Sequence, residues 1–314
     1  MTKKPLIIIT GPTAVGKTNL SIDLAKKIQG EIISADSMQV YRGMDIGTAK
    51  ITKEEMDGIP HHLIDILNTD EPFNVAIFQE KARQAIDEIY NRKHIPIIVG
   101  GTAFYIQALL YGIDFTEEEH DNSYRDKLGE LSNSEEGKIS LHEMLQKIDP
   151  EYAKTVHYNN AKRVIRALEY HHFTGKKFSE YNEEQRMRDA EYDFKYFVLT
   201  DDRAVLYERI NKRVDVMASS GLLDEVTALY KQNLPREYTS MQGVGYREVF
   251  DFLDGNCTYE EAVEEIKKNT RHFAKRQLTW FRKEENVTWV DKASFNRNDE
   301  KILDYVIEQV KDIL

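Results

Sequence analysis

A segment near the N-terminus has the residue types and spacing of a phosphate-binding loop. This loop consists of Gly11, Pro12, Thr13, Ala14, Val15, Gly16, Lys17 and Thr18. In such a loop the backbone N–H groups surround a diphosphate, the lysine reaches its outer oxygens, and the threonine hydroxyl can bind Mg²⁺. The apolar run at residues 6–9 predicts a strand before the loop, and the amphipathic run at residues 19–25 predicts a helix after it, whose dipole adds positive potential. We therefore expect these eight residues to bind a phosphorylated molecule, with Thr18 as a metal ligand. A glycine turn without a ligand is the alternative.

A second candidate group follows the apolar run at residues 30–35, which is typical of a strand buried on both faces of a sheet. The run ends on Asp36, and Ser37, Met38 and Gln39 come next. A carboxylate, a hydroxyl and an amide this close together are suited to hydrogen-bonding the polar edge of a substrate. An aspartate that only closes a turn is the competing interpretation.

The apolar run at residues 94–99 predicts a further strand, and it leads into Gly100, Gly101 and Thr102. In proteins that use ATP in such a loop, an acid at the end of a neighbouring strand usually helps to hold the metal. Residues 100–102, directly after this strand, include no acid. The pattern therefore argues against ATP as the ligand.

Basic residues gather in two segments. Lys162, Arg163 and Arg166 are three and four residues apart, so a helix would present all three on adjoining faces. The segment at residues 267–283 holds seven Lys or Arg and no acid. Phosphate groups of RNA are bound by such stripes, although each stripe could also be an ordinary solvated helix face. In the second segment we expect Phe273, Trp280 and Phe281 to pack on the core and leave the cations Arg271, Lys275, Arg276 and Arg282 free.

Two glycines precede a Tyr–Arg pair in the segment at residues 241–247, which begins Met241-Gln242. Glycines at this spacing suggest close approach of the backbone to a ligand, with Arg247 as a bidentate phosphate clamp. An ordinary turn is the alternative.

The elements that must position these residues alternate between strands and helices in the first third of the chain. This pattern predicts an α/β fold with a doubly wound parallel sheet around the phosphate-binding loop. From about residue 115 the pattern becomes helical and charged, which predicts a helical insertion. We expect a first core segment at residues 1–114, the insertion at residues 115–193, and the rest of the core with a basic C-terminal helix at residues 194–314. Further strands are expected at residues 60–65 and 194–200, and helices at residues 74–91, 103–111, 141–148, 160–173, 203–218, 222–232 and 259–283.

Composition narrows the class of protein. The chain has 314 residues with 41% hydrophobic and 31% charged residues, as in globular proteins. It contains neither a run of about 20 apolar residues nor a signal-peptide pattern at its start, so no membrane association and a cytoplasmic location are expected. The net charge of −11 argues against indiscriminate nucleic-acid binding. The single cysteine does not predict a metal site, because it has no cysteine partner. The adjacent histidine pairs at residues 61–62 and 171–172 do not predict one either, because neighbouring side chains point in different directions.

Several of these motifs, taken in order, resemble the tRNA dimethylallyltransferases of bacterial type, which are prenyltransferases. The resemblance covers nearly the whole chain, from residue 11 to about residue 282, without a departure at the positions expected to be catalytic. It rests on the phosphate-binding loop, Asp36-Ser-Met-Gln-Val-Tyr41, Gly47-Thr-Ala-Lys50, Pro60-His-His-Leu-Ile-Asp65, Gly100-Gly-Thr102, Arg163-Val-Ile-Arg-Ala-Leu-Glu169, Gln242-Gly-Val-Gly-Tyr-Arg247 and Ala274-Lys-Arg-Gln277.

The resemblance implies transfer of a dimethylallyl group from dimethylallyl diphosphate to N6 of the adenosine 3′ of the anticodon, with release of pyrophosphate. It implies Asp36 as the proton acceptor, Thr102 as an orienting group, and Lys17 and Arg247 as stabilisers of the leaving group, with Mg²⁺ as cofactor. It also implies the anticodon stem-loop of tRNA as the partner, and we expect the protein to be a monomer. The residues expected at the tRNA are Asp36, Ser37, Met38, Gln39, Lys162, Arg163, Arg166, Gln242, Arg271, Lys275 and Arg276.

Two other functions share parts of this pattern. A small-molecule or nucleotide kinase would have the same loop and sheet, and would release ADP instead of pyrophosphate. A non-catalytic RNA-binding protein would use the loop only as a nucleotide-dependent switch, and would bind RNA without turnover of either donor.

Overall fold

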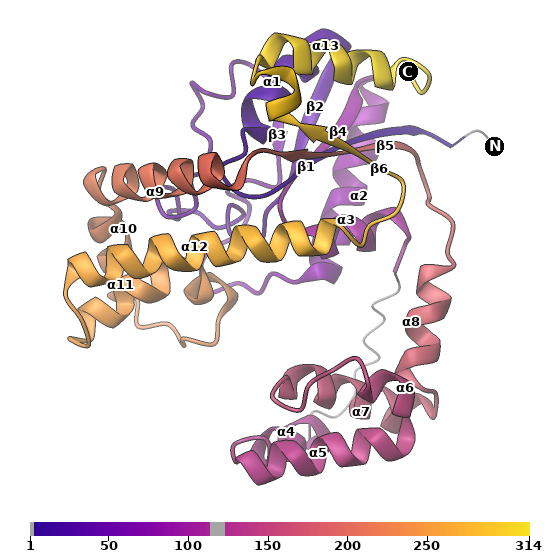
Figure 1. Cartoon of the computed structure of the whole chain (residues 1–314), viewed down its shortest axis with the longest axis vertical. Coiled ribbons are helices and arrows are strands. Elements are labelled where there is room, and N and C mark those ends of the chain that lie inside the picture. The colour runs from indigo at the N-terminus through magenta and orange to yellow at the C-terminus, as the bar shows by residue number, and fades with distance from the viewer. Residues whose placement is uncertain (1–2, 114–122) are drawn as a thin grey trace. The chain divides into compact units, whose positions relative to one another are not determined.

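The computed structural model describes residues 3–113 and 123–314. Its centre is a six-stranded sheet in the order β3-β2-β4-β1-β5-β6, in which every neighbouring pair is parallel (Figure 1). The strands are β1 (Pro5–Thr10), β2 (Gly30–Ala35), β3 (His61–His62), β4 (Ile95–Gly100), β5 (Asp193–Thr200) and β6 (Val287–Asp291). This arrangement confirms the doubly wound α/β fold. The segment at residues 60–65 was expected to be a longer strand, but only two of its residues pair in the sheet.

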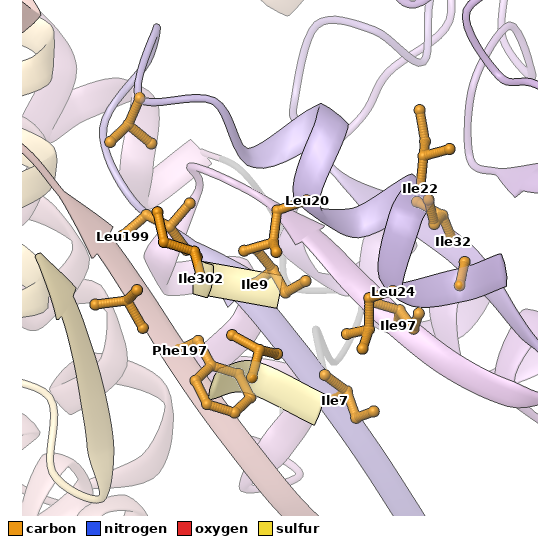
Figure 2. Close-up of a cluster of buried hydrophobic side chains, with 14 of the residues drawn as sticks. Ile7, Ile9, Leu20, Ile22, Leu24, Ile32, Ile97, Phe197, Leu199 and Ile302 are labelled. Carbon is orange, nitrogen blue, oxygen red and sulfur yellow. The ribbon is translucent and has the colours of Figure 1, made fainter. Parts of the chain in front are cut away.

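Helices cover both faces of the sheet. Helices α1 (Lys17–Ile28) and α13 (Asp299–Val310) pack together on one face, while α2 (Val75–Asn91) and α3 (Ala103–Leu110) pack together on the other (Figure 1). Figure 2 shows the core on the α1 side, where Ile7 and Ile9 of β1 meet Leu24 of α1 and Ile302 of α13. Successive strand residues point to opposite faces, and Leu6 and Ile8 are also fully buried. The uninterrupted apolar runs in the sequence follow from burial on both faces.

Four further helices complete this part of the molecule: α9 (Arg203–Ser219), α10 (Leu222–Tyr230), α11 (Tyr246–Leu253) and α12 (Tyr259–Phe281). Helix α12 packs against α9, α11 and α3. It begins with a capping box, in which the Thr258 hydroxyl accepts from the Glu261 N–H and the Glu261 carboxylate accepts from the Thr258 N–H. The sequence patterns predicted α9, α10 and α12 but not α11, β6 or α13. Two short 3₁₀ helices, η1 (Thr239–Gln242) and η2 (Lys292–Phe295), lie in the connections.

The chain divides into two compact units, of which the second runs from Tyr111 to Ala190. The first unit closes where the second is inserted, because the Glu191 N–H donates to the Leu110 carbonyl at 2.9 Å. The insertion was expected at residues 115–193; the predicted start lies outside the described residues, and β5 of the first unit already begins at Asp193.

The second unit is helical and has a hydrophobic core of its own. Val164 and Leu168 of α7 pack there with Leu141 and Leu145 of α5. Its helices are α4 (Ser123–Leu131), α5 (Glu135–Ile148), α6 (Pro150–Ala153), α7 (Ala161–Thr174) and α8 (Phe178–Arg186). Among the residues that the structure describes in either unit, no helix has the length and apolar character needed to cross a membrane.

Candidate active site

Three strand ends meet at the carboxyl edge of the sheet. The pairing of β4 with its two neighbours places Gly100 beside both Thr10 of β1 and Ala35 of β2. The Thr10 hydroxyl donates to the Gly100 carbonyl at 2.7 Å, and the Thr102 N–H donates to the Ala35 carbonyl at 3.3 Å. A Cβ at position 100 would lie 2.2 Å from the Ala35 oxygen, so glycine is required there. The register therefore brings the phosphate-binding loop, Asp36 and Thr102 to one edge of the sheet, as open α/β folds do with their ligands.

The phosphate-binding loop has the backbone conformation that its glycines allow. Gly11 and Gly16 have φ values of 143° and 98°, in the region that L side chains rarely adopt. A Cβ at position 11 would also lie 2.5 Å from the Leu199 carbonyl oxygen. Helix α1 begins at Lys17, and Thr18 in its first turn is exposed. The helix N-terminus and the Thr18 hydroxyl are thus open to a ligand.

Lys17 lies in a polar and partly closed environment. Its Nζ donates to the carbonyls of Gly11 and Pro12 at 3.0 and 2.9 Å. Burial lowers the pKa of Lys17 to about 8; the positive charge of Arg213 lowers it further, and the negative charge of Asp36 opposes the shift. Both charged groups therefore act on the lysine of the loop.

Arg213 lies in α9 and was not identified as a site residue from the sequence. It makes no hydrogen bond or ion pair with another described residue, although it acts on the charge of Lys17. Arg247, the cation expected at this point, lies in the first turn of α11. Its side chain is 51% exposed, and its guanidinium is 3.7 Å from the Glu248 carboxylate. Sequence spacing did not reveal that the charge of Arg213 acts on the lysine of the loop.

Asp36 closes a turn with one of its two carboxylate oxygens. Its Oδ1 accepts from the N–H groups of Met38 and Gln39 at 2.8 and 3.2 Å. Among the described residues none donates to its other oxygen, Oδ2. The turn therefore orients the carboxylate and leaves Oδ2 available to a substrate. The two interpretations of Asp36 from the sequence are compatible.

Gln39, which was expected to hydrogen-bond a base, is held by the protein. Its Nε2 donates to the Thr48 and Ala49 carbonyls at 3.2 and 3.4 Å, and its Oε1 accepts from the Ser34 hydroxyl at 3.4 Å. Gln39 therefore ties the turn at Asp36 to the loop at residues 45–49.

Glu225 of α10 fixes the other side of that loop. Its carboxylate accepts from the three successive N–H groups of residues 45–47 at 2.7–3.0 Å and from the Tyr246 hydroxyl at 2.6 Å. A Cβ on Gly47 would lie 2.6 Å from the Tyr246 ring, so the ring needs glycine there. Glu225 was not singled out in the sequence, and Tyr246 was noted only as part of the Gly-Tyr-Arg motif. The Gly47-Thr and Gly-Tyr-Arg motifs were the only sign of this contact.

The segment at residues 241–247 lies against the turn at Asp36. A Cβ on Gly243 would be 2.7 Å from the Met38 Cε atom, which shows how closely these two segments pack. Gly245 has a φ of 100° and begins α11. Gln242 donates to the Glu237 carbonyl at 2.9 Å. Met38 and the glycine-rich segment are thus packed together, while the approach of this segment to a ligand stays a prediction.

The exposed face of α12 carries the second basic segment. Lys275 and Arg276 are exposed, as is Arg282 just after the helix, whereas Arg271 donates to the Asn211 side chain at 2.6 Å. The expectation that Phe273 packs on the core is wrong, because its side chain is 38% exposed. The buried positions of α12 include Ala274, Gln277 and Phe281, and residue 273 lies about 100° away from Ala274 around the helix.

In the second unit, α7 presents the first basic segment to solvent. Lys162, Arg163 and Arg166 are exposed, while Val164 and Leu168 face the core of that unit. The amphipathic interpretation of this helix is confirmed. The assignment of its cations to RNA stays a prediction.

One histidine of the first pair, His62, contacts a buried carboxylate. His62 and His94 each hydrogen-bond the buried carboxylate of Glu31 at 2.7 Å, and Arg92 donates to it twice at 2.8 Å. The hydrogen bonds from Arg92 lower the pKa of Glu31 to about 2. Burial opposes this shift, and the hydrogen bonds with the two histidines add to it. No group of three His, Cys, Asp or Glu within the described ranges is suited to a metal ion.

Comparison with known proteins relates the whole chain to one group of enzymes. The family model described as IPP transferase matches residues 39–284. A tRNA dimethylallyltransferase of Lachnoclostridium phytofermentans is 55% identical over 305 residues, which cover 97% of each chain. One from Bacillus cereus is 51% identical over 304 residues, which cover 97% of this chain and 95% of that protein.

Solved structures give the same result. A tRNA isopentenylpyrophosphate transferase from Bacillus halodurans has a TM-score of 0.74 and 47% sequence identity, with 99% of this chain and 98% of that chain covered. A eukaryotic dimethylallyltransferase acting on tRNA has a TM-score of 0.79 and 34% identity, with 92% of this chain and 74% of that chain covered.

Proposed function

The chain belongs to the IPP transferase family, and on that premise we propose that it transfers a dimethylallyl group from dimethylallyl diphosphate to N6 of the adenosine 3′ of the tRNA anticodon, releasing pyrophosphate. It is an enzyme of tRNA modification. The observation that supports the detailed assignment most strongly is the meeting of the phosphate-binding loop, Asp36 and Thr102 at one edge of the sheet.

The loop binds the diphosphate of the donor. As the bond between C1 and the diphosphate oxygen breaks, negative charge grows on the leaving group. The loop N–H groups, the N-terminus of α1 and the Lys17 ammonium stabilise this charge. Arg213 is assigned as a second cation of the donor site because its charge already acts on Lys17. The role of Arg247 as a clamp stays a prediction.

The residues of the loop fit a magnesium ion. The Thr18 hydroxyl is exposed directly after the lysine, where such loops bind the ion, and Mg²⁺ takes few protein ligands beside phosphate oxygens and water. When bound with the donor, the ion would neutralise part of the diphosphate charge.

Asp36 acts on the acceptor. The exocyclic N6 is a weak nucleophile because its lone pair is delocalised into the purine ring, so a carboxylate that accepts its proton lowers the barrier to attack on C1. Oδ2 is the atom proposed for this task, because Oδ1 already accepts from two N–H groups. Thr102 orients the amine or the diphosphate. Ser37 and the Met38 side chain are assigned to contacts with the base.

The adenosine reaches this edge only when it leaves the base stack, and anticodon loops expose bases that can be splayed out. The cations of α12 and of α7 bind the phosphates of the stem and loop. We propose that the enzyme works as a monomer in the cytoplasm, where unmodified tRNA is found.

Labelled dimethylallyl diphosphate and unmodified tRNA test this proposal directly. We expect one pyrophosphate per modified adenosine, identified by nucleoside analysis. Release of ADP from ATP at a comparable rate would indicate a kinase instead. Binding of tRNA without turnover of either donor would indicate a non-catalytic RNA-binding protein.

A further inference from the structure

One buried side chain joins the two loops of the donor site. Gln277 of α12 is 6% exposed. Its Oε1 accepts from the N–H of Thr13 in the phosphate-binding loop at 2.9 Å, and its Nε2 donates to the Gly101 carbonyl at 3.0 Å. Both polar groups of the amide are thus used, and they join segments that lie 264 and 176 residues from Gln277 in the chain.

The fit around this amide leaves little freedom. A Cβ on Gly101 would lie 2.1 Å from the Gln277 Nε2 atom, so the amide occupies the space that a side chain at position 101 would need. The Thr13 N–H is directed to the protein, which fixes the orientation of the peptide that begins the turn of the loop. Thr10, at the end of β1 and three residues before Thr13, is held to the same strand end as Gly101, because its hydroxyl donates a hydrogen bond to the Gly100 carbonyl.

The same turn of α12 has a second, outward side. Lys275 and Arg276, two residues and one residue before Gln277, are exposed and are assigned above to RNA phosphates. Gln277 therefore connects the RNA-facing helix with the loops that carry the donor and Thr102. Resting on the function proposed above, we propose that Gln277 is a positioning residue that sets the phosphate-binding loop, and hence C1 of the donor, relative to Thr102 and the acceptor base.

The expected effect follows from the geometry of the reaction. Transfer requires N6 and C1 in near contact, and a displacement of about 1 Å far from the reacting atoms can reduce a rate by about 10²-fold. The variant Gln277→Leu keeps the bulk of the side chain and loses both hydrogen bonds. Gln277→Glu keeps an acceptor for Thr13, loses the bond to Gly101 when ionised, and places negative charge beside the diphosphate.

Gln79 provides a matched control. It is a second buried glutamine that bridges two elements, since its Nε2 in α2 donates to the Ala108 carbonyl in α3 at 2.8 Å. We expect Gln277→Leu to lower the single-turnover rate at saturating tRNA and donor by about 10²-fold, and Gln79→Leu to lower only the melting temperature. A Gln277→Leu rate within twofold of the wild type, or an equal loss of rate in both variants, would overturn the proposal.

A binding experiment without chemistry keeps this proposal separate from the proposed function. Calorimetry with inorganic pyrophosphate and Mg²⁺ measures the loop alone. We expect weaker binding in Gln277→Leu and still weaker binding in Gln277→Glu, with no change in Gln79→Leu. Unchanged pyrophosphate affinity in both Gln277 variants would contradict the positioning role even if no prenyl transfer were found. Failure of the wild type to modify tRNA, together with the expected affinities, would contradict only the transfer reaction.

Discussion

Burial and, to a smaller extent, the positive charge of Arg213 lower the pKa of Lys17 to about 8. A bound diphosphate favours the protonated lysine. We therefore expect donor affinity to fall as the pH rises through about 8, and binding at pH 9 to take up a proton. Calorimetry in buffers of different ionisation enthalpy measures this uptake. It should disappear in Lys17→Gln, and equal affinity at pH 7 and pH 9 would contradict the assignment.

Replacing Arg213 should change both the affinity and its pH dependence. In Arg213→Gln the pKa of Lys17 should rise, because the positive charge that helps to lower it is removed. The fall of donor affinity with pH should therefore occur at higher pH. At pH 7 the donor should bind about 10-fold to 100-fold less tightly, as expected for loss of a hydrogen bond from a charged group. Arg203→Gln, an exposed arginine of the same helix, serves as the control. If the control variant behaved in the same way, Arg213 would have no special relation to the donor.

Asp36→Asn tests the proton acceptor. Asparagine keeps Oδ1 for the turn with Met38 and Gln39 but cannot take the proton. General-base assistance contributes about 10²–10⁴ in rate, so kcat should fall by that factor while donor Kd stays within a few fold. Asp36→Ala also removes the turn and should in addition be less stable. Near-normal turnover of the asparagine variant, or a donor affinity reduced in parallel with kcat, would rule out this role.

The salt dependence of tRNA affinity reports how many phosphate contacts the protein makes. Each phosphate contact that is lost should reduce the slope of log affinity against log salt by about 0.7–0.9. We expect such a reduction in Arg163→Ala, Arg166→Ala, Lys275→Ala and Arg276→Ala, and none in Lys301→Ala, an exposed lysine of α13. Donor affinity should stay the same in all five. Equal slopes throughout would show that these cations belong to solvated helix faces.

The ionised carboxylate of Glu31 should make the free energy of unfolding depend on pH in the acid range. Its pKa in the folded protein, about 2, is below its ordinary value of 4.5. The stabilisation is therefore complete above pH 4.5 and is lost as the pH falls toward 2, with a size of about 3 kcal/mol at pH 7. Urea unfolding of Glu31→Gln at a series of pH values should show a deficit that shrinks over this range. Glu80→Gln, at an exposed position of α2, should show little deficit.

The central strands and the turn between β1 and α1 could be predicted because their signals are local. The apolar run at residues 6–9 is fully buried, as are Ile97 and Ile98 in the run at residues 94–99. A glycine-lysine pattern needs no distant partner to be recognised. The spacing of Val164 and Leu168 likewise predicted the inward side of α7. Helix α13 carried the same kind of signal in Ile302, Val306 and Val310, yet its charged surroundings concealed it.

Residues that act across the fold had no such signal. Arg213 lies in an ordinary amphipathic helix, and only the packing of α9 brings its charge to Lys17. Glu225 contacts a loop about 180 residues earlier in the chain. Phe273 was assigned to the core from its residue type, whereas the helical phase set by Ala274 directs it outward. Tertiary contacts determine the surroundings of these three side chains, and the pattern of residues along the sequence gives no information on such contacts.

The bond between Glu191 and Leu110 means that the helical insertion leaves and re-enters the core at a single point. A chain that passed directly from one to the other would keep β5 and α3 in place. Closed exit points of this kind are where domains are gained and lost in evolution, since neither strand pairing nor helix packing is interrupted. The inserted unit can accordingly diverge, or be exchanged for another, while the sheet and the loops at its carboxyl edge are inherited intact.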